Sequence, residues 1–406
     1  MKKAVAPRET ASPNPAVRPV VRKARAWALP ICAVVAGLAF VVPGPTAAAA
    51  VTRPASQQAY TTFPGRLYGV AAVSADDVWA VGLSGPGGSL IVHWNGSAWS
   101  QSLNGPGYLE GVAASSARDA WAVGGTSWFS PNQTLAEHWN GKTWTQVRTP
   151  SPAGGGAFNA VAVTSPDSAW AVGQAGPGPG IPSATTPLIE RWNGKTWTIQ
   201  RYQAPAGGGH FAAVAATSPS SAWAVGSTGP ASEGTGQQTL IEHWNGTAWT
   251  RVPSPDEPGS TASFLNAVTV VSAGNAWAVG YSAVGGRYRA LTMHWDGHRW
   301  TLLPASSPGG DAQLLGVTFS WTNNIWAVGY VNPTRCGNGG PQCQTLAEHW
   351  NSVSASWRDT PTPNPTAGYL NMLWSISAVS RTDIWAVGTT DYASTLIVHW
   401  NGTSWS

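Results

Sequence analysis

The sequence repeats one tryptophan-rich unit seven times between residues 67 and 406. In each copy one Trp opens a Trp-Ala-Val-Gly motif, a second follows a His or Arg, and a third lies five to seven positions later. The three sets are Trp79, Trp121, Trp170, Trp223, Trp277, Trp326 and Trp385; Trp94, Trp139, Trp192, Trp244, Trp295, Trp350 and Trp400; and Trp99, Trp144, Trp197, Trp249, Trp300, Trp357 and Trp405. They account for 21 of the 25 tryptophans, so the repeat has to be explained before any domain is counted.

Each copy predicts four short β-strands. The first is apolar and β-branched, as in residues 67–73, and a turn rich in Ser, Asp and Asn leads into the second, which carries the Trp-Ala-Val-Gly motif. The third ends at the His-Trp pair, and the Asn-Gly that follows it tolerates positive φ at both residues, which predicts a tight hairpin into the fourth. No segment shows helical periodicity. Four antiparallel strands recurring every 42–59 residues are typical of propeller blades.

Ring closure explains the tryptophans. One four-stranded sheet cannot bury both faces, but sheets packed face to face around an axis can, and each Trp can bury roughly 150–250 Å² between them. An open array would need capping units, and the sequence shows none. We therefore predict an all-β fold, a seven-bladed β-propeller with four antiparallel strands per blade. The expected blades are residues 67–105, 106–152, 153–206, 207–258, 259–308, 309–365 and 366–406.

The two ends of the repeat region look complementary. The seventh copy stops at Ser406, a few residues short of the fourth strand of the other copies. Tyr60 to Pro64, ahead of the first copy, resemble the strand end that is lacking. We expect the segment 51–66 to lie beside the seventh blade and to help close the ring.

The end of the motif strand also points to a family. In the second copy this strand ends in two glycines, Gly124 and Gly125, while the other copies keep one. A variable loop, an aromatic residue and a downstream Trp follow. This arrangement resembles the kelch and galactose-oxidase propeller family, although His-Trp-Asn-Gly stands where that family has an aromatic–acid pair. The resemblance covers residues 67–406 and implies architecture; it implies no particular activity, because one fold serves many functions.

The first 50 residues have the layout of a secretory signal peptide. Seven basic residues lie among the first 25, an apolar run covers 26–42, and small residues follow at 46–50, so we expect cleavage after Ala50. Pro30 interrupts the run, which weighs against a retained membrane anchor. The mature chain would carry 15 basic and 17 acidic residues, and so no basic face for nucleic acid. We therefore expect a secreted, extracellular monomer.

Two cysteines would remain after cleavage, Cys336 and Cys343, with six residues between them. In an oxidising compartment they predict a local disulfide, and metal binding is the weaker alternative because no His lies near. Copper chemistry of the galactose-oxidase kind needs a Cys crosslinked to Tyr, and this disulfide would leave no thiol for it. No metal or cofactor is predicted.

Residues that recur in every blade are better explained by folding than by chemistry. Six histidines share one position of the third strand, and the third copy has Arg191 there: His93, His138, His243, His294, His349 and His399. We interpret them as structural residues that bond between neighbouring blades; a ring of metal-binding histidines is the alternative. Acids precede four of these positions, at Glu137, Glu190, Glu242 and Glu348, and we interpret them as ordinary strand residues. No pair of carboxylates stands out as a glycosidase would need, so no catalytic residue is predicted.

One face of the predicted disc varies more than the other. Because neighbouring strands are antiparallel, the turns between strands one and two and between three and four share one face, which we call the turn face. The loops between strands two and three share the other, the loop face, with the connections between blades. From the motif Gly to the Leu of the third strand, 7, 10, 14, 13, 10, 16 and 7 residues intervene. This variation suggests that the loop face acquires specificity; neutral drift is the alternative.

Non-repeated side chains in these loops are the candidate ligand contacts: Trp128, Phe129, Tyr281, Arg287, Tyr288, Arg289, Tyr330, Arg335, Asp391 and Tyr392. Aromatic residues with polar neighbours can stack on sugars or anchor a protein partner, although each could instead pin its own loop. We predict a secreted, non-catalytic propeller that binds an extracellular glycan or protein through the loop face. The alternatives are a secreted carbohydrate-active hydrolase or lyase with acids near the propeller axis, and a scaffold for a partner made by the same cell.

Overall fold

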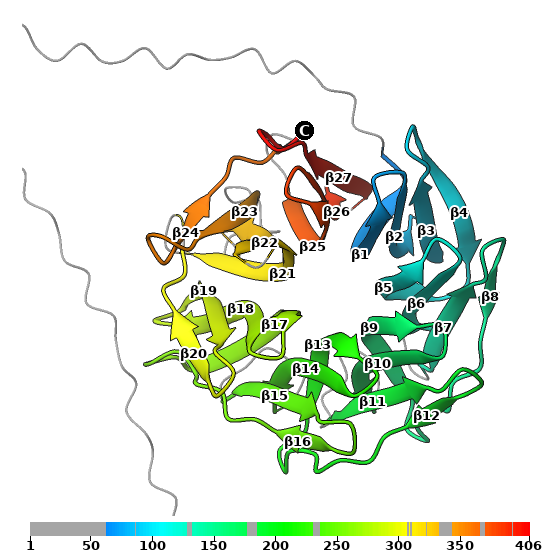
Figure 1. Ribbon diagram of the computed structural model, residues 1–406, viewed down its shortest axis with the longest axis horizontal. Coiled ribbons are helices and arrows are strands. Elements are labelled where there is room, and N and C mark those ends of the chain that lie inside the picture. The colour runs from blue at the N-terminus through cyan, green and yellow to red at the C-terminus, as the bar shows by residue number, and fades with distance from the viewer. Residues whose placement is uncertain are drawn as a thin grey trace, which may run out of the picture. The chain divides into compact units, whose positions relative to one another are not determined.

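Seven antiparallel sheets surround a common axis in the computed structural model of this chain (Figure 1). The structure describes residues 62–85, 87–127, 132–176, 185–229, 236–306, 308, 311–321, 323–332, 343–365, 370–391 and 393–406, which lie in the compact unit Ser56–Ser406. These residues form strands and no α-helix. In this part of the chain, then, no helix is long and apolar enough to cross a membrane. The predicted all-β, seven-bladed propeller is confirmed.

Each blade runs from an inner strand near the axis to an outer strand at the rim (Figure 1). The inner strands are β1 (Gly65–Ser74), β5 (Tyr108–Ser116), β9 (Gly156–Ser165), β13 (Gly209–Ser218), β17 (Ala262–Ser272), β21 (Ala312–Trp321) and β25 (Asn371–Ser380). The second strands are β2 (Asp77–Ser84), β6 (Asp119–Gly125), β10 (Ser168–Ala175), β14 (Ser221–Thr228), β18 (Asn275–Val284), β22 (Asn324–Val331) and β26 (Asp383–Thr390). The third strands are β3 (Ser89–Trp94), β7 (Thr134–Trp139), β11 (Thr186–Trp192), β15 (Thr239–Trp244), β19 (Arg287–Trp295), β23 (Gln344–Asn351) and β27 (Ser394–Trp400). The outer strands are β4 (Trp99–Gly105), β8 (Trp144–Gln146), β12 (Trp197–Ile199), β16 (Trp249–Arg251), β20 (Trp300–Leu303) and β24 (Ser356–Asp359).

The same three tryptophans join each pair of neighbouring blades. Trp79 of the first blade is 1% exposed and packs on Trp139 and Trp144 of the second, with ring centroids 4.9 and 5.1 Å apart. The motif Trp of each later blade packs on its successor in the same way. In the last interface Trp385 meets Trp94 and Trp99 of the first blade at 5.3 and 5.4 Å, so the contacts form a closed cycle.

The outer edge of the seventh blade comes from two separate segments. Residues 404–406 pair with one end of β27, where Trp405 bridges Trp400. Residues 63–65 pair with the other end: Pro64 bridges Ser394, and the N–H of Gly65 donates to the carbonyl of Ala393 at 2.7 Å. These bonds hold Phe63 and Pro64 against the seventh blade, while Tyr60 and Thr61 lie outside the described residues.

The Asn-Gly turn closes the outer hairpin through its asparagine side chain. Asn95 Oδ1 accepts hydrogen bonds from the N–H groups of Ser97 and Ala98, both at 3.0 Å. Only Gly96 of the pair takes a positive φ, 89°. The expectation of positive φ at both residues was wrong, because the asparagine serves as a side-chain cap for two backbone donors.

A β-bulge interrupts every inner strand at the same place. In the first blade Gly82 pairs with Leu67 and Val81 with Gly69, which leaves Tyr68 as the extra residue. A Cβ on Gly82 would overlap the carbonyl oxygen of Arg66, so the motif requires glycine here. The seven bulge residues are of six types, with asparagine in two blades: Tyr68, Glu110, Asn159, Ala212, Asn266, Leu315 and Trp374.

Three of the four repeated acids, Glu190, Glu242 and Glu348, are not ordinary strand residues, because neighbouring sheets bury them. Glu190 is 0% exposed, and neither carboxylate oxygen has a hydrogen-bond partner among the described residues. Burial raises its pKa, and that of Glu348, to about 8. Glu242 differs because Arg251, opposite it on the next strand, bonds its Oε1 at 3.0 Å. Glu190 faces Ile199 at that place and is left without a cation.

Trp121→Ala should lower the free energy of unfolding by about 3–5 kcal/mol, because it removes a fully buried indole between two blades. Trp321→Ala is the control: this Trp is 63% exposed, and its loss should change stability by less than about 0.5 kcal/mol. Urea unfolding followed by circular dichroism measures both. Equal effects of the two substitutions would contradict the role given to the interface tryptophans.

Glu190→Gln should remove a pH dependence of stability. The unfolded chain releases this proton near the ordinary pKa of 4.5, whereas the folded chain holds it to about 8. The folded state therefore binds more protons between these values, and wild-type stability falls as the pH rises through that window. The variant should gain about 4 kcal/mol over wild type on going from pH 4 to pH 8. Urea titrations at both pH values test this; Arg251 opposes the rise in the pKa of Glu242, so Glu242→Gln should show a smaller gain.

Candidate functional site

Five side chains from the inner strands of blades one, two and seven form what we call the axial cluster: Arg66, Tyr68, Tyr108, Glu110 and Trp374. Three of these are bulge residues. The ring of Tyr68 meets that of Trp374 edge-on, with centroids 5.5 Å apart at 85°. Arg66 hydrogen-bonds to Tyr68, and the charge of Glu110 acts on both tyrosines. Strand β1 contacts both β5 and β25, so the cluster spans three adjacent blades.

The loop of the second blade reaches the axial cluster. Asn132, in the connection between β6 and β7, is 1% exposed and donates from Nδ2 to the hydroxyl of Tyr108 at 2.9 Å. Its Oδ1 accepts from the N–H of Ser127 in the same connection. The cluster therefore lies at the loop-face end of the inner strands.

The axial cluster is a set of hydrogen-bond donors at neutral pH. Burial, followed by the charge of Glu110, raises the pKa of both Tyr68 and Tyr108 to about 12. Burial alone raises the pKa of Glu110 to about 8, so this carboxyl is mostly protonated at pH 7. The phenol of Tyr68 and the carboxylic acid of Glu110, beside the guanidinium of Arg66, suit a ligand that presents acceptor oxygens, whereas Tyr108 is only 2% exposed.

Other bulge residues bind neighbouring blades together. Asn159 Nδ2 donates to the carbonyl of Phe211 in the next blade at 2.7 Å, and Asn266 Nδ2 donates to that of Leu314 at 2.8 Å. These asparagines therefore link the inner strands of neighbouring blades. The bulge residues of the axial cluster are instead aromatic or acidic.

Several residues predicted from the sequence lie outside the described residues: Trp128, Phe129, Arg335, Tyr392 and Cys336. Cys343 is 1% exposed and is part of a disulfide. Its pairing with Cys336 stays a prediction. Among the described residues, no three His, Cys, Asp or Glu side chains gather as a metal site would require.

The predicted ligand contacts of the fifth blade fall into a buried group and an exposed group. Tyr281 is 6% exposed, stacks on Phe264 at 4.7 Å and meets Tyr288 edge-on at 5.3 Å. Arg287 and Arg289 are exposed instead and line a hollow of about 570 Å³ beside the outer strand β20. A packing role accounts for Tyr281, and the two arginines remain accessible.

The candidates of blades six and seven lie beside the axial cluster. Tyr330 is 9% exposed and donates its hydroxyl hydrogen to Gln313 Oε1 at 2.9 Å. It packs with Met372 in a group that Trp374 borders. Asp391 takes a positive φ of 59°, and its N–H donates to the carbonyl of Leu370 at 2.9 Å.

Sequence reasoning missed the axial cluster, although a signal for it was present. Trp374 and Trp321 are two of the four tryptophans that the repeat does not explain. The residue two positions before the recurrent Val or Ile of the first strand is the bulge residue, and it takes six identities in the seven copies. Aligning the copies on Trp79 and its equivalents reveals both irregularities.

The recurring histidines bond within their own blades. His93 stacks on Trp79, with centroids 4.0 Å apart, and its Nε2 lies 2.8 Å from Asp77 Oδ1. In five other blades the equivalent His forms a hydrogen bond with the side chain of an Asp, Asn or Ser. The expected bond between blades was wrong for histidine, because the imidazole lies between two side chains of strand two. Arg191 does reach the next blade, where it donates to the carbonyl of Pro219 at 3.4 Å.

Comparison with known proteins supports the architecture. No protein-family model and no curated protein matches the sequence. The structure of YCF48 bound to D1 peptide is 15% identical, with 84% of this chain and 96% of that one covered and a TM-score of 0.53. The WD40 β-propeller domain of Doa1 is 12% identical, with 83% and 94% covered and a TM-score of 0.53. A PL25 ulvan lyase bound to -[GlcA(1-4)Rha3S]- is 9% identical, with 85% and 96% covered and a TM-score of 0.55. At these identities the shared feature is the β-propeller fold.

Proposed function

We propose that this chain is a secreted, non-catalytic β-propeller that binds an extracellular glycan or protein at its loop face, with the axial cluster as the central contact. One observation carries the proposal. The interface positions repeat seven times, whereas the bulge position holds six residue types in seven blades, and three of its residues lie with Arg66 and Tyr108. Folding does not require that diversity, and bulges are a common means of aiming side chains at a site.

The chemistry of the axial cluster limits the classes of ligand that it can bind. Its protonated groups donate hydrogen bonds, and Arg66 adds a positive charge, so a ligand rich in carbonyl, hydroxyl or carboxylate oxygens is favoured. Such oxygens occur on peptides and on acidic sugars. The similar YCF48 structure holds a peptide and the ulvan lyase structure an acidic saccharide, so both classes belong in the test.

Secretion and family membership are further parts of this proposal. Secretion is supported by the basic, apolar and small-residue layout of residues 1–50. A relationship to the kelch and galactose-oxidase propellers is supported by Gly124 and Gly125 and by the downstream tryptophans.

Binding should depend on the axial cluster. Glycan and peptide arrays probed with the purified chain would identify a ligand, and calorimetry would measure its affinity. Tyr68→Phe and Glu110→Ala should each weaken binding by about tenfold, the loss expected for one buried hydrogen bond. Arg287→Ala and Tyr288→Ala in blade five are the matched controls on the same face. Loss of binding in these two variants, without loss in the axial-cluster variants, would show that the site lies in blade five.

An eliminating or hydrolysing enzyme is the second candidate, favoured by Glu110 alone. A carboxyl that stays protonated to about pH 8 could act as a general acid beside the positive charge of Arg66. A glycosidase needs two carboxylates, however, and Glu110 is the only one among the seven bulge residues.

Release of reducing ends from neutral and uronate-containing polysaccharides tests this candidate. No turnover is expected from the wild-type chain. Turnover that Glu110→Gln abolishes and Tyr288→Ala leaves intact would overturn the non-catalytic proposal.

A further inference from the structure

Trp321 breaks the repeat on the turn face, opposite the loops. Its position is serine in the other six copies: Ser74, Ser116, Ser165, Ser218, Ser272 and Ser380. Four of these hydroxyls accept a hydrogen bond from the N–H two residues later, as Ser380 does from Thr382 at 3.2 Å. Trp321 cannot cap the turn in this way, and its indole is 63% exposed. Folding does not explain this exchange of a capping hydroxyl for an exposed ring.

The second turn of the same blade is also irregular. Trp350 and Trp357 are seven positions apart, compared with five for the equivalent pair in the other blades. The longer turn places Ala355 at a φ of 48° and leaves Val353 97% exposed. Blade six therefore departs from the repeat at both of its turn-face connections, and at neither of them for an evident structural reason.

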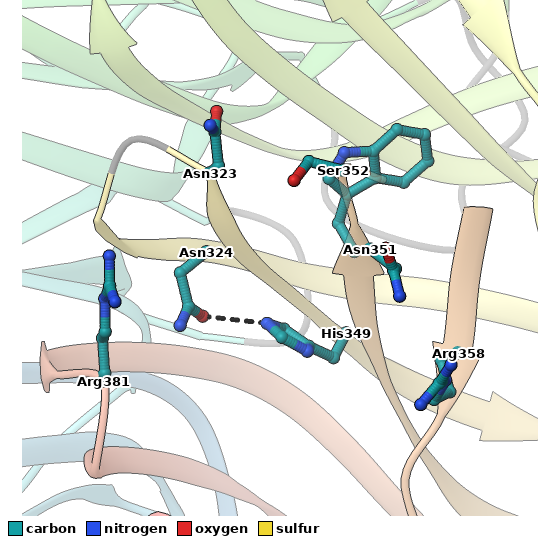
Figure 2. A pocket seen from close by; sticks show the side chains of 8 residues that line it. Asn323, Asn324, His349, Asn351, Ser352, Arg358 and Arg381 are labelled. Atoms are coloured by element: carbon teal, nitrogen blue, oxygen red, sulfur yellow. Dashed lines mark hydrogen bonds between the residues drawn. The ribbon is translucent and has the colours of Figure 1, made fainter. Parts of the chain in front are cut away.

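Two hollows meet beside these turns, at Arg381 of blade seven. One, of about 530 Å³, lies between the turns that carry Trp321 and Arg381. The other, of about 260 Å³, is lined by the Asn324–His349 pair, with Arg381 and Arg358 on opposite sides of that pair (Figure 2). The guanidinium of Arg381 lies 5.4 Å from the ring centroid of Trp321, which joins the aromatic ring to the cationic hollow.

The lining of the two hollows is cationic and rich in amides and hydroxyls. Arg358 and Arg381 carry positive charge, and no Asp or Glu is among the described residues that line either hollow. Asn324 Oδ1 accepts from His349 Nε2 at 3.1 Å and from Trp326 Nε1 at 2.8 Å, so its Nδ2 is oriented by the fold as a donor. Burial, and then the charge of Arg358, lower the pKa of His349 and keep its ring neutral.

We propose that the turn face of blades six and seven is a second binding site, for an acidic sugar residue of a polysaccharide. The sugar ring stacks on the exposed indole of Trp321, and its carboxylate or sulfate group binds Arg381 and Arg358. Amide and hydroxyl groups at Asn323, Asn351 and their neighbours suit the remaining sugar hydroxyls.

A sugar fits this surface better than a protein partner does. Protein interfaces are built around a well-buried apolar centre and cover about 1,600 Å². Here the exposed large apolar side chains are Trp321 and Val353, one on each turn, and polar groups line both hollows. A flat indole with hydrogen-bonding groups beside it meets the needs of a single sugar residue.

Calorimetric titration of the full chain with oligosaccharides tests the proposal. The probes are oligogalacturonate, which carries carboxylates, a chondroitin sulfate oligosaccharide, and a neutral maltooligosaccharide. At least one acidic probe should bind and the neutral one should not. Trp321→Ser restores the residue of the other six copies, so the variant should fold normally and weaken acidic-probe binding by about tenfold or more. Arg381→Gln should weaken it as much, because one charged hydrogen-bonding partner is lost.

Arg299→Gln is the matched control, since Arg299 is another largely exposed arginine on the turn face, in blade five. It should change the affinity by less than about twofold, whereas general charge attraction would make the two arginine variants alike and leave Trp321→Ser without effect. Tyr68→Phe and Glu110→Ala should leave this binding intact, which separates it from the loop-face site. Failure of both acidic probes to bind, or binding insensitive to Trp321→Ser, would overturn the proposal.

Discussion

The contact between one tryptophan and the tryptophan pair of the next blade holds this propeller together. Trp79 lies between His93 of its own blade and Trp139 and Trp144 of the next, and the pattern continues until Trp385 reaches the first blade. Because the cycle is closed, every sheet is packed on both faces. The inner strands are then held around the axis by contacts made further out, and their own side chains are free to vary.

The glycine of the motif allows a bulge that carries a variable side chain on each inner strand. It lets the carbonyl of the opposite inner strand approach closely, and the bulge that results adds one residue to each inner strand. On each inner strand the residue before the bulge stays buried, as Leu67 and Leu109 do, whereas the bulge residue varies, as Tyr68 and Glu110 show. Structural and variable positions therefore alternate along a single strand. Asn159 shows that a blade can also use this position to bind its neighbour.

The two faces of the propeller diverge by different means. On the loop face, the connections vary in length and Asn132 brings one of them to the axial cluster. The turn face repeats closely, so its one irregular blade is conspicuous: Trp321 gives up a turn-capping hydroxyl and lies beside two hollows that share Arg381. Low overall charge makes such local groupings of cations more significant for binding, because few acids are available to neutralise them.

The sequence by itself determined the number of blades, their four strands and the aromatic seams, because these depend on a local pattern repeated seven times. It also contained the irregularities at Trp321 and Trp374, though not their surroundings. Only the tertiary structure decided that Tyr281 is buried, that Glu190 lacks a cation and that Tyr68 meets Trp374. The physical reason is that burial and electrostatics depend on which segments of neighbouring blades cover a residue. Tyr68 and Trp374 lie 306 positions apart, and ring closure alone brings them together.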